Sequence, residues 1–378
     1  MKRPSPPPHR PKTFSKPKRK IGGNALQRST RNPKGNKILL HIESVVADAS
    51  NGPEPNDSVY RGLYGCNTPQ EIETLRDEWS FKFNGKARRA LPKKFPPQKR
   101  ATIEALLTSV GSTGAPILTN EQMCREAANM LAASLISQVR NNAEIEVGMI
   151  TFISGDDSSS HLNPTINLYG SLKRMKKVVG LIRPDFLLGA FELALFNSHG
   201  HPDGGQVLQG HGHAIIAGKP GLLRRAEQVA IKQKHRFTPN ITGAKAIDIK
   251  RVDTSEINLA RVANYLFKPP YKCMNWNPGK DGKPGHMNGS EKGDRYIRYL
   301  RLAQIRTMMR FEDTLFASGT GVKLRGEIVS FLRGLAKKEG AHGTAVLHPD
   351  AIASFWAAIM PELPRSKQWN LPIIKTRH

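Results

Sequence analysis

Residues 191–219 read FELALFNSHGHPDGGQVLQGHGHAIIAGK, and they predict a β-hairpin. The apolar runs 191–196 and 214–217 have the composition of two strands, and the segment between them is rich in Gly, Asn, Asp and Pro. His211 and His213 are two residues apart at the start of the second run, so strand alternation places both imidazoles on one face of the sheet. The stretch therefore predicts two paired strands that present two imidazoles to one point.

A carboxylate belongs to the same hairpin. If the hairpin is symmetric about residue 202, Glu192 lies across from Gly212, between the two histidines. Two imidazoles and one carboxylate form a three-ligand divalent metal site with open positions, and the bound ion keeps a charge of about +1 that polarises a phosphate oxygen. Imidazole favours Mn, Zn, Fe or Co, whereas Mg²⁺ is usable when phosphate supplies further oxygens. We expect Glu192, His211 and His213 to be the metal ligands.

The same residue types also occur in proteins without a metal. A single His-x-His pair on a strand is more often a pair of surface or hydrogen-bonded histidines, and an ion pair also accounts for a buried Glu192. His199, His201 and Asp203 lie in the turn of the hairpin, where side chains are ordinarily exposed, and Asp203 is the alternative third ligand.

Charge and composition indicate the class of partner. The chain has 378 residues, with 58 Lys and Arg against 31 Asp and Glu, which gives a formal net charge of +27. A polyanion is the expected partner. An anionic membrane surface is the competing interpretation, but no apolar run approaches the roughly 20 residues of a spanning helix, and the basic start lacks a secretory apolar region. Three distant cysteines, Cys66, Cys124 and Cys273, are typical of reduced thiols, so we expect a soluble, cytoplasmic protein that binds nucleic acid and no membrane.

The order of elements predicts an α+β fold. Strands are expected at 145–153, 190–196, 211–217 and 246–252, and helices at 120–141, 166–182, 222–234 and 255–268. This order favours a central antiparallel sheet with helices packed on one face, close to a split βαβ arrangement. The polar run 154–160 is expected to be a loop, and Asp253 is expected to cap the last helix with Glu256 three residues on.

Four regions are expected along the chain. Residues 1–37 hold twelve Lys or Arg, no acidic residue and seven prolines, so they form a disordered tail that either follows phosphate backbone or is a solvated or targeting segment. Residues 38–119 form an accessory region, in which a helix at 69–83 is followed by a non-helical basic arm from Lys86 to Arg100. Residues 120–275 form the core domain. Residues 276–378 form a basic helical region, with a linker or flexible loop at 273–294 and helices near 295–317, 322–338 and 348–363.

A second constellation lies at the end of the 255–268 helix. Tyr265 and Lys268 are three residues apart and are expected to share a face of its last turn. Such a pair is ordinarily a tyrosine packed on the sheet beside a lysine that reaches into solvent. It is also a candidate nucleophile, because a nearby ammonium stabilises a phenolate, and Lys268 is equally suited to protonate a leaving oxygen or hold a phosphate.

Three motifs in this order resemble the HUH endonucleases, and more narrowly the rolling-circle replication initiators of plasmids and phages. They are Met149-Ile150-Thr151-Phe152, His211-Gly212-His213 and the run NYLFK at 264–268. The resemblance covers 145–272. It implies an HUH nuclease core, a Mg or Mn ion, and Tyr265 as a nucleophile that nicks and rejoins single-stranded or stem-loop origin DNA through a 5′-phosphotyrosine.

The chain departs from the family pattern at Gly212, which stands where the family has a bulky apolar residue, and in a long hairpin loop. Tyr265 and Tyr271 are six apart with two prolines between them, so we expect a one-tyrosine enzyme. The sequence has no GxxxxGK[ST], so unwinding and synthesis are expected from a host helicase and polymerase. An HUH transposase or relaxase with the same chemistry is the alternative, and a non-catalytic nucleic-acid-binding protein with a structural zinc is the alternative from another class. The sequence leaves the oligomeric state open.

Overall fold

The computed structural model describes residues 66–108, 120–198, 206–240, 242–270, 274–277, 286–288, 296–341, 349–363 and 368–376. The expected tail at 1–37 lies outside these residues, so its predicted disorder stays a prediction.

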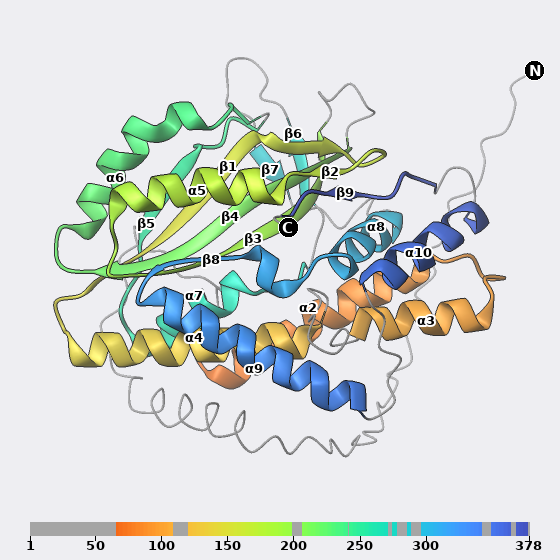
Figure 1. The fold of residues 1–378 in the computed structure, drawn as a ribbon, viewed down its shortest axis with the longest axis horizontal. Coiled ribbons are helices and arrows are strands. Elements are labelled where there is room, and N and C mark those ends of the chain that lie inside the picture. The colour runs from red at the N-terminus through yellow and green to blue at the C-terminus, as the bar shows by residue number, and fades with distance from the viewer. Residues whose placement is uncertain are drawn as a thin grey trace, which may run out of the picture.

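The fold is α+β, as the sequence predicts, and it is built on one large sheet (Figure 1). Five strands pair antiparallel in the order β5-β1-β4-β3-β8, and on the same side of β3 as β8, but towards its other end, β6 pairs parallel and carries β7. The strands are β1 (Glu146–Ser160), β3 (Phe186–Ser198), β4 (Gln206–Gly218), β5 (Ile247–Arg251), β6 (Met274–Asn277), β7 (His286–Asn288) and β8 (Leu315–Gly319). A separate two-stranded sheet joins β2 (Thr165–Ile166) to β9 (Ile373–Ile374) in parallel.

Helices cover both faces of the large sheet, so the expectation of helices on one face is wrong. On one face lie α5 (Leu168–Ile182) and α6 (Leu222–Gln233), whose side chains meet the sheet at Gly212 and Gly148. On the other face α7 (Glu256–Leu266) lies between the sheet and α4 (Glu121–Asn141), with α9 (Gly321–Ala341) beside them (Figure 1). The remaining helices are α2 (Pro69–Arg89), α3 (Pro97–Thr108), α8 (Tyr296–Thr307), α10 (Pro349–Ile359) and the short turns 234–236, 311–314 and 360–362.

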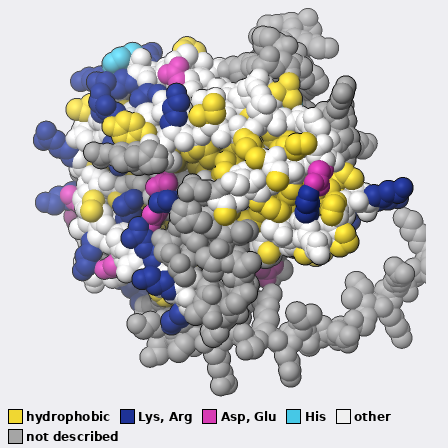
Figure 2. All heavy atoms as spheres, turned by 45° about the vertical axis from the view of Figure 1, so that its right-hand side comes forward, with side chains coloured by type: hydrophobic (Ala, Val, Ile, Leu, Met, Phe, Trp, Pro, Cys, Tyr) yellow, Lys and Arg dark blue, Asp and Glu magenta, His cyan; other side chains and the backbone are white. Residues whose placement is uncertain are grey.

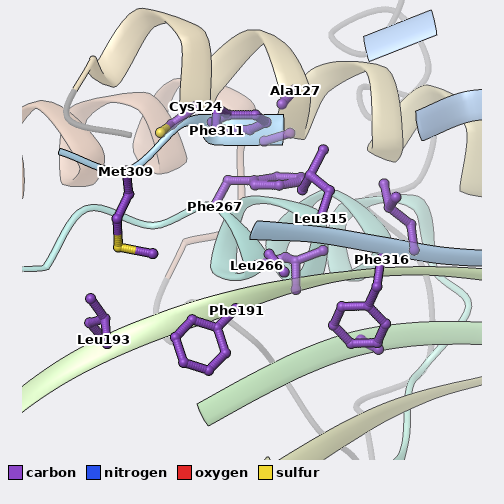
Figure 3. Close-up of a cluster of buried hydrophobic side chains, with 14 of the residues drawn as sticks. Cys124, Ala127, Phe191, Leu193, Leu266, Phe267, Met309, Phe311, Leu315 and Phe316 are labelled. Carbon is purple, nitrogen blue, oxygen red and sulfur yellow. The ribbon is translucent and has the colours of Figure 1, made fainter. Parts of the chain in front are cut away.

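The hydrophobic core continues through the sheet into the second helical layer. Figure 3 shows Phe267 at the end of α7 beside Phe311, with Cys124 and Ala127 of α4 next to them. The rings of Phe267 and Phe311 are stacked with centroids 5.6 Å apart, and both side chains are buried. Apolar burial of this kind is the main stabilising term in folding, and here it fixes the end of α7 against the sheet.

The register of the central hairpin differs by one residue from the expected one. Glu192 pairs with His211, and Gly212 pairs with Phe191. Because directly paired residues share a face, the expected pairing with Gly212 would have turned Glu192 away from the histidines. The observed register places Glu192, His211 and His213 on one face. The strands also run to Ser198 and from Gln206, so the expected long hairpin loop is wrong.

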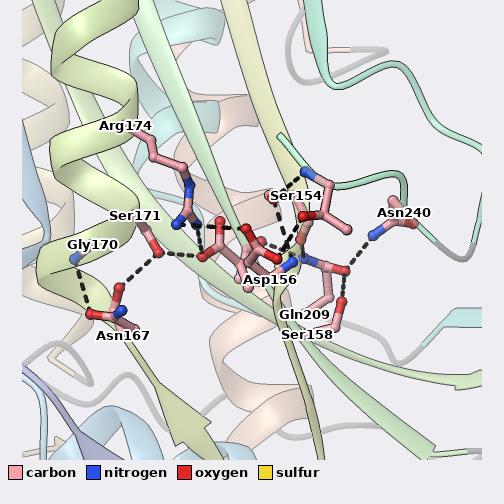
Figure 4. A network of polar contacts seen from close by, with 12 residues as sticks. Ser154, Asp156, Ser158, Asn167, Gly170, Ser171, Arg174, Gln209 and Asn240 are labelled. Carbon is pink, nitrogen blue, oxygen red and sulfur yellow. Dashed lines mark hydrogen bonds and ion pairs between the residues drawn. The ribbon is translucent and has the colours of Figure 1, made fainter. Parts of the chain in front are cut away.

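The polar run 154–160 is a strand rather than the expected loop. It extends β1 along β4, with an irregular register between Ile153 and Ser158. The buried Gln209 of β4 makes this possible, because its side chain accepts hydrogen bonds from Ser158 and Asn240 and donates to the Ser154 carbonyl (Figure 4).

A second polar group ties the same part of β1 to α5. Arg174 and Ser171 both donate to Asp157, and Asn167 caps the helix by accepting from the Gly170 amide (Figure 4). Polar side chains that satisfy one another across strands and helices allow a polar sequence to stay in a sheet.

Three helix expectations need correction. The expected non-helical arm at 86–100 is helical at both ends, since α2 continues to Arg89 and α3 begins at Pro97, a residue that suits the first helical turn. The expected helix at 295–317 ends at Thr307 and is followed by β8. Asp253 does not cap α7: Ser255 is the N-cap residue, and Asp253 accepts hydrogen bonds from the amide and hydroxyl of Ser255.

Candidate active site

The hairpin and α7 bring the expected site residues to one place. Glu192 Oε2 lies 3.4 Å from His211 Nε2 and 3.6 Å from His213 Nε2. The potential ligand atoms of these three residues all lie within 4.8 Å of one another. Their side chains are 8–15% exposed, so the cluster is largely sheltered from water.

The spacing of these atoms fits a divalent ion. Metal bonds of about 2.0–2.2 Å place neighbouring ligand atoms about 2.8–3.1 Å apart in octahedral geometry and about 3.3–3.6 Å apart in tetrahedral geometry. The two carboxylate-to-imidazole separations are close to these ranges. Two nitrogens and one carboxylate oxygen suit Mn²⁺ or Zn²⁺, and Mg²⁺ where a phosphate completes the shell.

The charges of the cluster are those a metal site needs. Burial raises the pKa of Glu192, but the Lys268 ammonium and His211 outweigh it and hold the pKa of this carboxyl well below its usual value. Burial and the charges of His211 and Lys268 lower the pKa of His213 well below its usual value, although Glu192 acts in the opposite direction. At neutral pH Glu192 is therefore ionised and His213 is neutral, which are the metal-binding forms.

Thr151 of β1 orients one imidazole. Its Oγ1 forms a hydrogen bond of 3.0 Å with His213 Nδ1, and the two residues are direct neighbours in the β1–β4 ladder. When Nδ1 donates its proton to Thr151, the lone pair of Nε2 faces Glu192 and is free to bind a cation. The sequence singled out Thr151 as part of a motif but did not indicate this contact.

Tyr265 and Lys268 meet the same cluster from α7. The rings of Tyr265 and His213 have centroids 5.3 Å apart in an edge-on contact. Lys268 Nζ lies 3.8 Å from the centroid of the Tyr265 ring and 2.6 Å from Glu192 Oε2. The Lys268 ammonium therefore contacts both the ring of the candidate nucleophile Tyr265 and the Glu192 carboxylate.

The path of the chain differs from the expected one at this point. Lys268 does not share a helical face with Tyr265, because α7 ends at Leu266 and Phe267 is its C-cap residue. Lys268 follows in a turn, in which its amide donates to the Tyr265 carbonyl at 3.3 Å. This turn returns the lysine side chain over the tyrosine ring.

The contact between Lys268 and Glu192 is also what a simple buried ion pair would show. An ion pair alone neutralises Glu192. It does not account for two imidazole Nε2 atoms near the same oxygen, on rings one of which is oriented through its Nδ1 by Thr151. The arrangement of the three potential ligands therefore fits a metal site better than a simple ion pair.

The packing of the sheet explains why residue 212 is a glycine. A methyl group at this position would lie 2.5 Å from the sulfur of Met175, a fully buried residue of α5. Met175 thus takes the space on the far side of β4 that a bulky residue between the histidines would fill. The departure from the family pattern lies on the face opposite the cluster.

Five of the residues singled out in the sequence lie outside the described residues: His199, His201, Asp203, Tyr271 and Cys273. Sequence reasoning also missed Arg76 of α2 and its partner Asn264 of α7, which are both buried. A signal existed for Arg76, since helical spacing places it on the same stripe of α2 as Ile72 and Phe83.

No protein-family model matches the chain, and neither a curated protein nor a solved structure matches it. Among the described helices, none combines the length and apolar character needed to cross a membrane.

Proposed function

We propose that the protein is a rolling-circle replication initiator of the HUH type, which nicks and rejoins single-stranded DNA at a specific site. The observation that carries the proposal is the position of Lys268, 2.6 Å from Glu192 Oε2 and 3.8 Å from the Tyr265 ring centroid. It joins the candidate metal ligands to the candidate nucleophile. The His-bearing strand in the middle of an antiparallel sheet, with α7 on its face, supports the HUH core.

The proposed reaction is a transesterification by Tyr265. A divalent ion held by Glu192, His211 and His213 would supply charge to polarise the scissile phosphodiester. The phenolic oxygen of Tyr265 forms a bond to phosphorus while the bond from phosphorus to the 3′ oxygen breaks, which leaves a 5′-phosphotyrosine and a 3′ hydroxyl. The phenol releases one proton and the leaving oxygen takes up one, and Lys268, whose ammonium lies over the Tyr265 ring, would stabilise the charge on either oxygen. The reverse step closes the strand.

The charge of the protein supports a DNA substrate. The net charge is +27, and Figure 2 shows Lys and Arg side chains gathered over the left-hand part of the face in view. In this proposal origin DNA binds through its phosphates, and a host helicase and polymerase supply unwinding and synthesis. An HUH transposase or relaxase would use the same residues and differs in the DNA it recognises.

The test is covalent attachment to DNA. The protein is incubated with Mn²⁺ and a pool of random-sequence single-stranded oligonucleotides labelled at the 3′ end. We expect a labelled complex that survives denaturing electrophoresis, is lost in Tyr265→Phe, and persists in Tyr169→Phe, which changes an exposed tyrosine on α5. A wild-type protein that forms no complex with any divalent metal contradicts the proposal.

A further inference from the structure

Tyr265 lies in the last turn of α7, and Lys268 follows just after the helix ends, where the backbone has few hydrogen-bond donors of its own. The last four carbonyls of a helix lack amide partners within it. Pro269 and Pro270 follow at once, and proline has no N–H to donate. The amides of Phe267 and Lys268 both turn back to the Tyr265 carbonyl, so other carbonyls of this end need a donor from elsewhere.

Arg76 of α2 supplies those donors. Its Nη1 donates to the Asn264 carbonyl and to Asn264 Oδ1, both at 3.1 Å, and its Nη2 donates to the Phe267 carbonyl at 2.9 Å. These two carbonyls belong to the residues that precede Tyr265 and Lys268. The guanidinium thus bridges the backbone on both sides of the candidate nucleophile.

The charge of Arg76 suits this position. The side chain is 0% exposed, and its Nε donates to Glu121 Oε1 of α4 at 2.6 Å. A buried cation is stabilised by one carboxylate and by the negative end of the α7 dipole. The rigid planar fork of arginine reaches four acceptor atoms on three residues through three separate nitrogens, whereas a lysine has its donors on one nitrogen.

The same turn is also fixed by packing. Phe267 is stacked on Phe311 in the cluster of Figure 3. Asn264 completes the frame, since its Nδ2 donates to the Ala260 carbonyl at 2.9 Å while its Oδ1 accepts from Arg76. The backbone at 264–267 is therefore held both by an arginine and by an aromatic stack.

We propose that Arg76 is a positioning residue for Tyr265 and Lys268, and that the accessory helix α2 is in this way part of the active site. The proposal rests on the function proposed above. It adds a residue outside 145–272, the part of the chain that resembles the HUH family. Attack on phosphorus needs near-contact geometry, and a displacement of 1 Å costs about 100-fold in rate. A loosened turn at 264–268 should slow attachment without changing how DNA binds.

The test compares Arg76→Lys with Arg261→Lys. Arg261 is also a buried arginine that links α7 to the chain before α2, through the Cys66 carbonyl and Asn67 Oδ1, but it lies one turn before Tyr265. The first readout is amide hydrogen exchange, which needs no DNA. We expect exchange at 265–268 to rise about tenfold or more in Arg76→Lys and to change little in Arg261→Lys, because only the first variant removes the donors to this turn.

The second readout is single-turnover attachment to the oligonucleotide pool at saturating concentration. We expect the rate to fall about tenfold or more in Arg76→Lys, with the half-saturating DNA concentration and the Mn²⁺ affinity within about twofold of wild type. Asn264→Ala removes one acceptor of Arg76, so it should lower the attachment rate and raise the exchange at 265–268 by less than Arg76→Lys does. It replaces Arg76→Lys in both measurements if that variant does not fold.

The outcomes separate the two proposals. Unchanged exchange at 265–268 in Arg76→Lys or Asn264→Ala overturns the positioning role, whether or not DNA is attached. Equal losses of attachment rate in Arg76→Lys and Arg261→Lys overturn it too, because they indicate a general structural effect. Absence of attachment by the wild-type protein overturns the proposed function alone.

Discussion

Met175 and Gly212 show how the region between the histidines is filled from the opposite face of β4. Adding a methyl group in Gly212→Ala places it 2.5 Å from the Met175 sulfur. We expect the free energy of unfolding to fall by about 1–3 kcal/mol, nearer the lower figure because a methionine side chain is flexible. Chemical denaturation measures this change.

A double variant tests the cause. If the contact is responsible, Gly212→Ala and Met175→Ala together cost less than the sum of the single variants. The matched control is Gly180→Ala on α5, where an added methyl meets nothing within 4 Å and helix propensity predicts a small gain. Additive costs at Gly212 and Met175 would disprove that this contact is the reason for the glycine.

Thr151 gives the second residue-scale prediction. Thr151→Val keeps the shape of the side chain but removes the hydrogen bond to His213 Nδ1. We expect Mn²⁺ affinity to fall about 10–100-fold, as for other partners of metal-bound histidines, and Thr151→Ser to keep most of it. Calorimetric titration with Mn²⁺ measures the affinity. Wild-type affinity in Thr151→Val would mean that the contact does not orient a ligand.

Residue identities in the cluster were predictable, but their geometry was not. Period-two alternation is enough to put His211 and His213 on one face. The face of Glu192 depended on the register of the two strands, and the expected pairing was one residue off. The ion pair of Lys268 with Glu192 depends on the turn after α7, which spacing in the sequence does not describe.

At the scale of elements, the outer half of β1 depends on Gln209. Gln209→Ala removes the acceptor of Ser158 and Asn240 and the donor to the Ser154 carbonyl. Because buried polar groups then lack partners, we expect the free energy of unfolding to fall by about 1–3 kcal/mol and amide exchange at 154–160 to become faster. Ser158→Ala removes one of these contacts and should cost less. Equal protection of 154–160 in wild type and Gln209→Ala would show that the ladder alone holds this strand.

The same network explains why some elements could not be predicted. A run such as 154–160 has the composition of a loop, and it forms a strand only because residues from β4, α5 and 238–240 satisfy its polar groups. The strand β8 was missed for a related reason, since five residues leave too short a pattern to distinguish from the preceding helix. The long amphipathic helices α4, α5 and α9 were predictable because their apolar spacing repeats over several turns.

At the scale of the whole molecule, the net charge of +27 predicts salt-sensitive binding. We expect affinity for a single-stranded oligonucleotide to fall more than tenfold between 50 and 200 mM salt, which corresponds to about three or more neutralised phosphates. Fluorescence anisotropy measures this slope, and an oligonucleotide with an uncharged backbone is the control. A flat salt dependence would show that the excess charge does not contact DNA.

In the proposed mechanism a single metal site on the hairpin acts together with Tyr265 on α7. The most direct measurement is peptide mass spectrometry after reaction with single-stranded DNA, nuclease digestion and proteolysis. We predict a nucleotide linked through phosphate to Tyr265, formed with Mn²⁺ and absent both with chelator and in a His211→Ala, His213→Ala variant. A nucleotide on another residue, or one on Tyr265 that forms equally without metal or without both histidines, would contradict this mechanism.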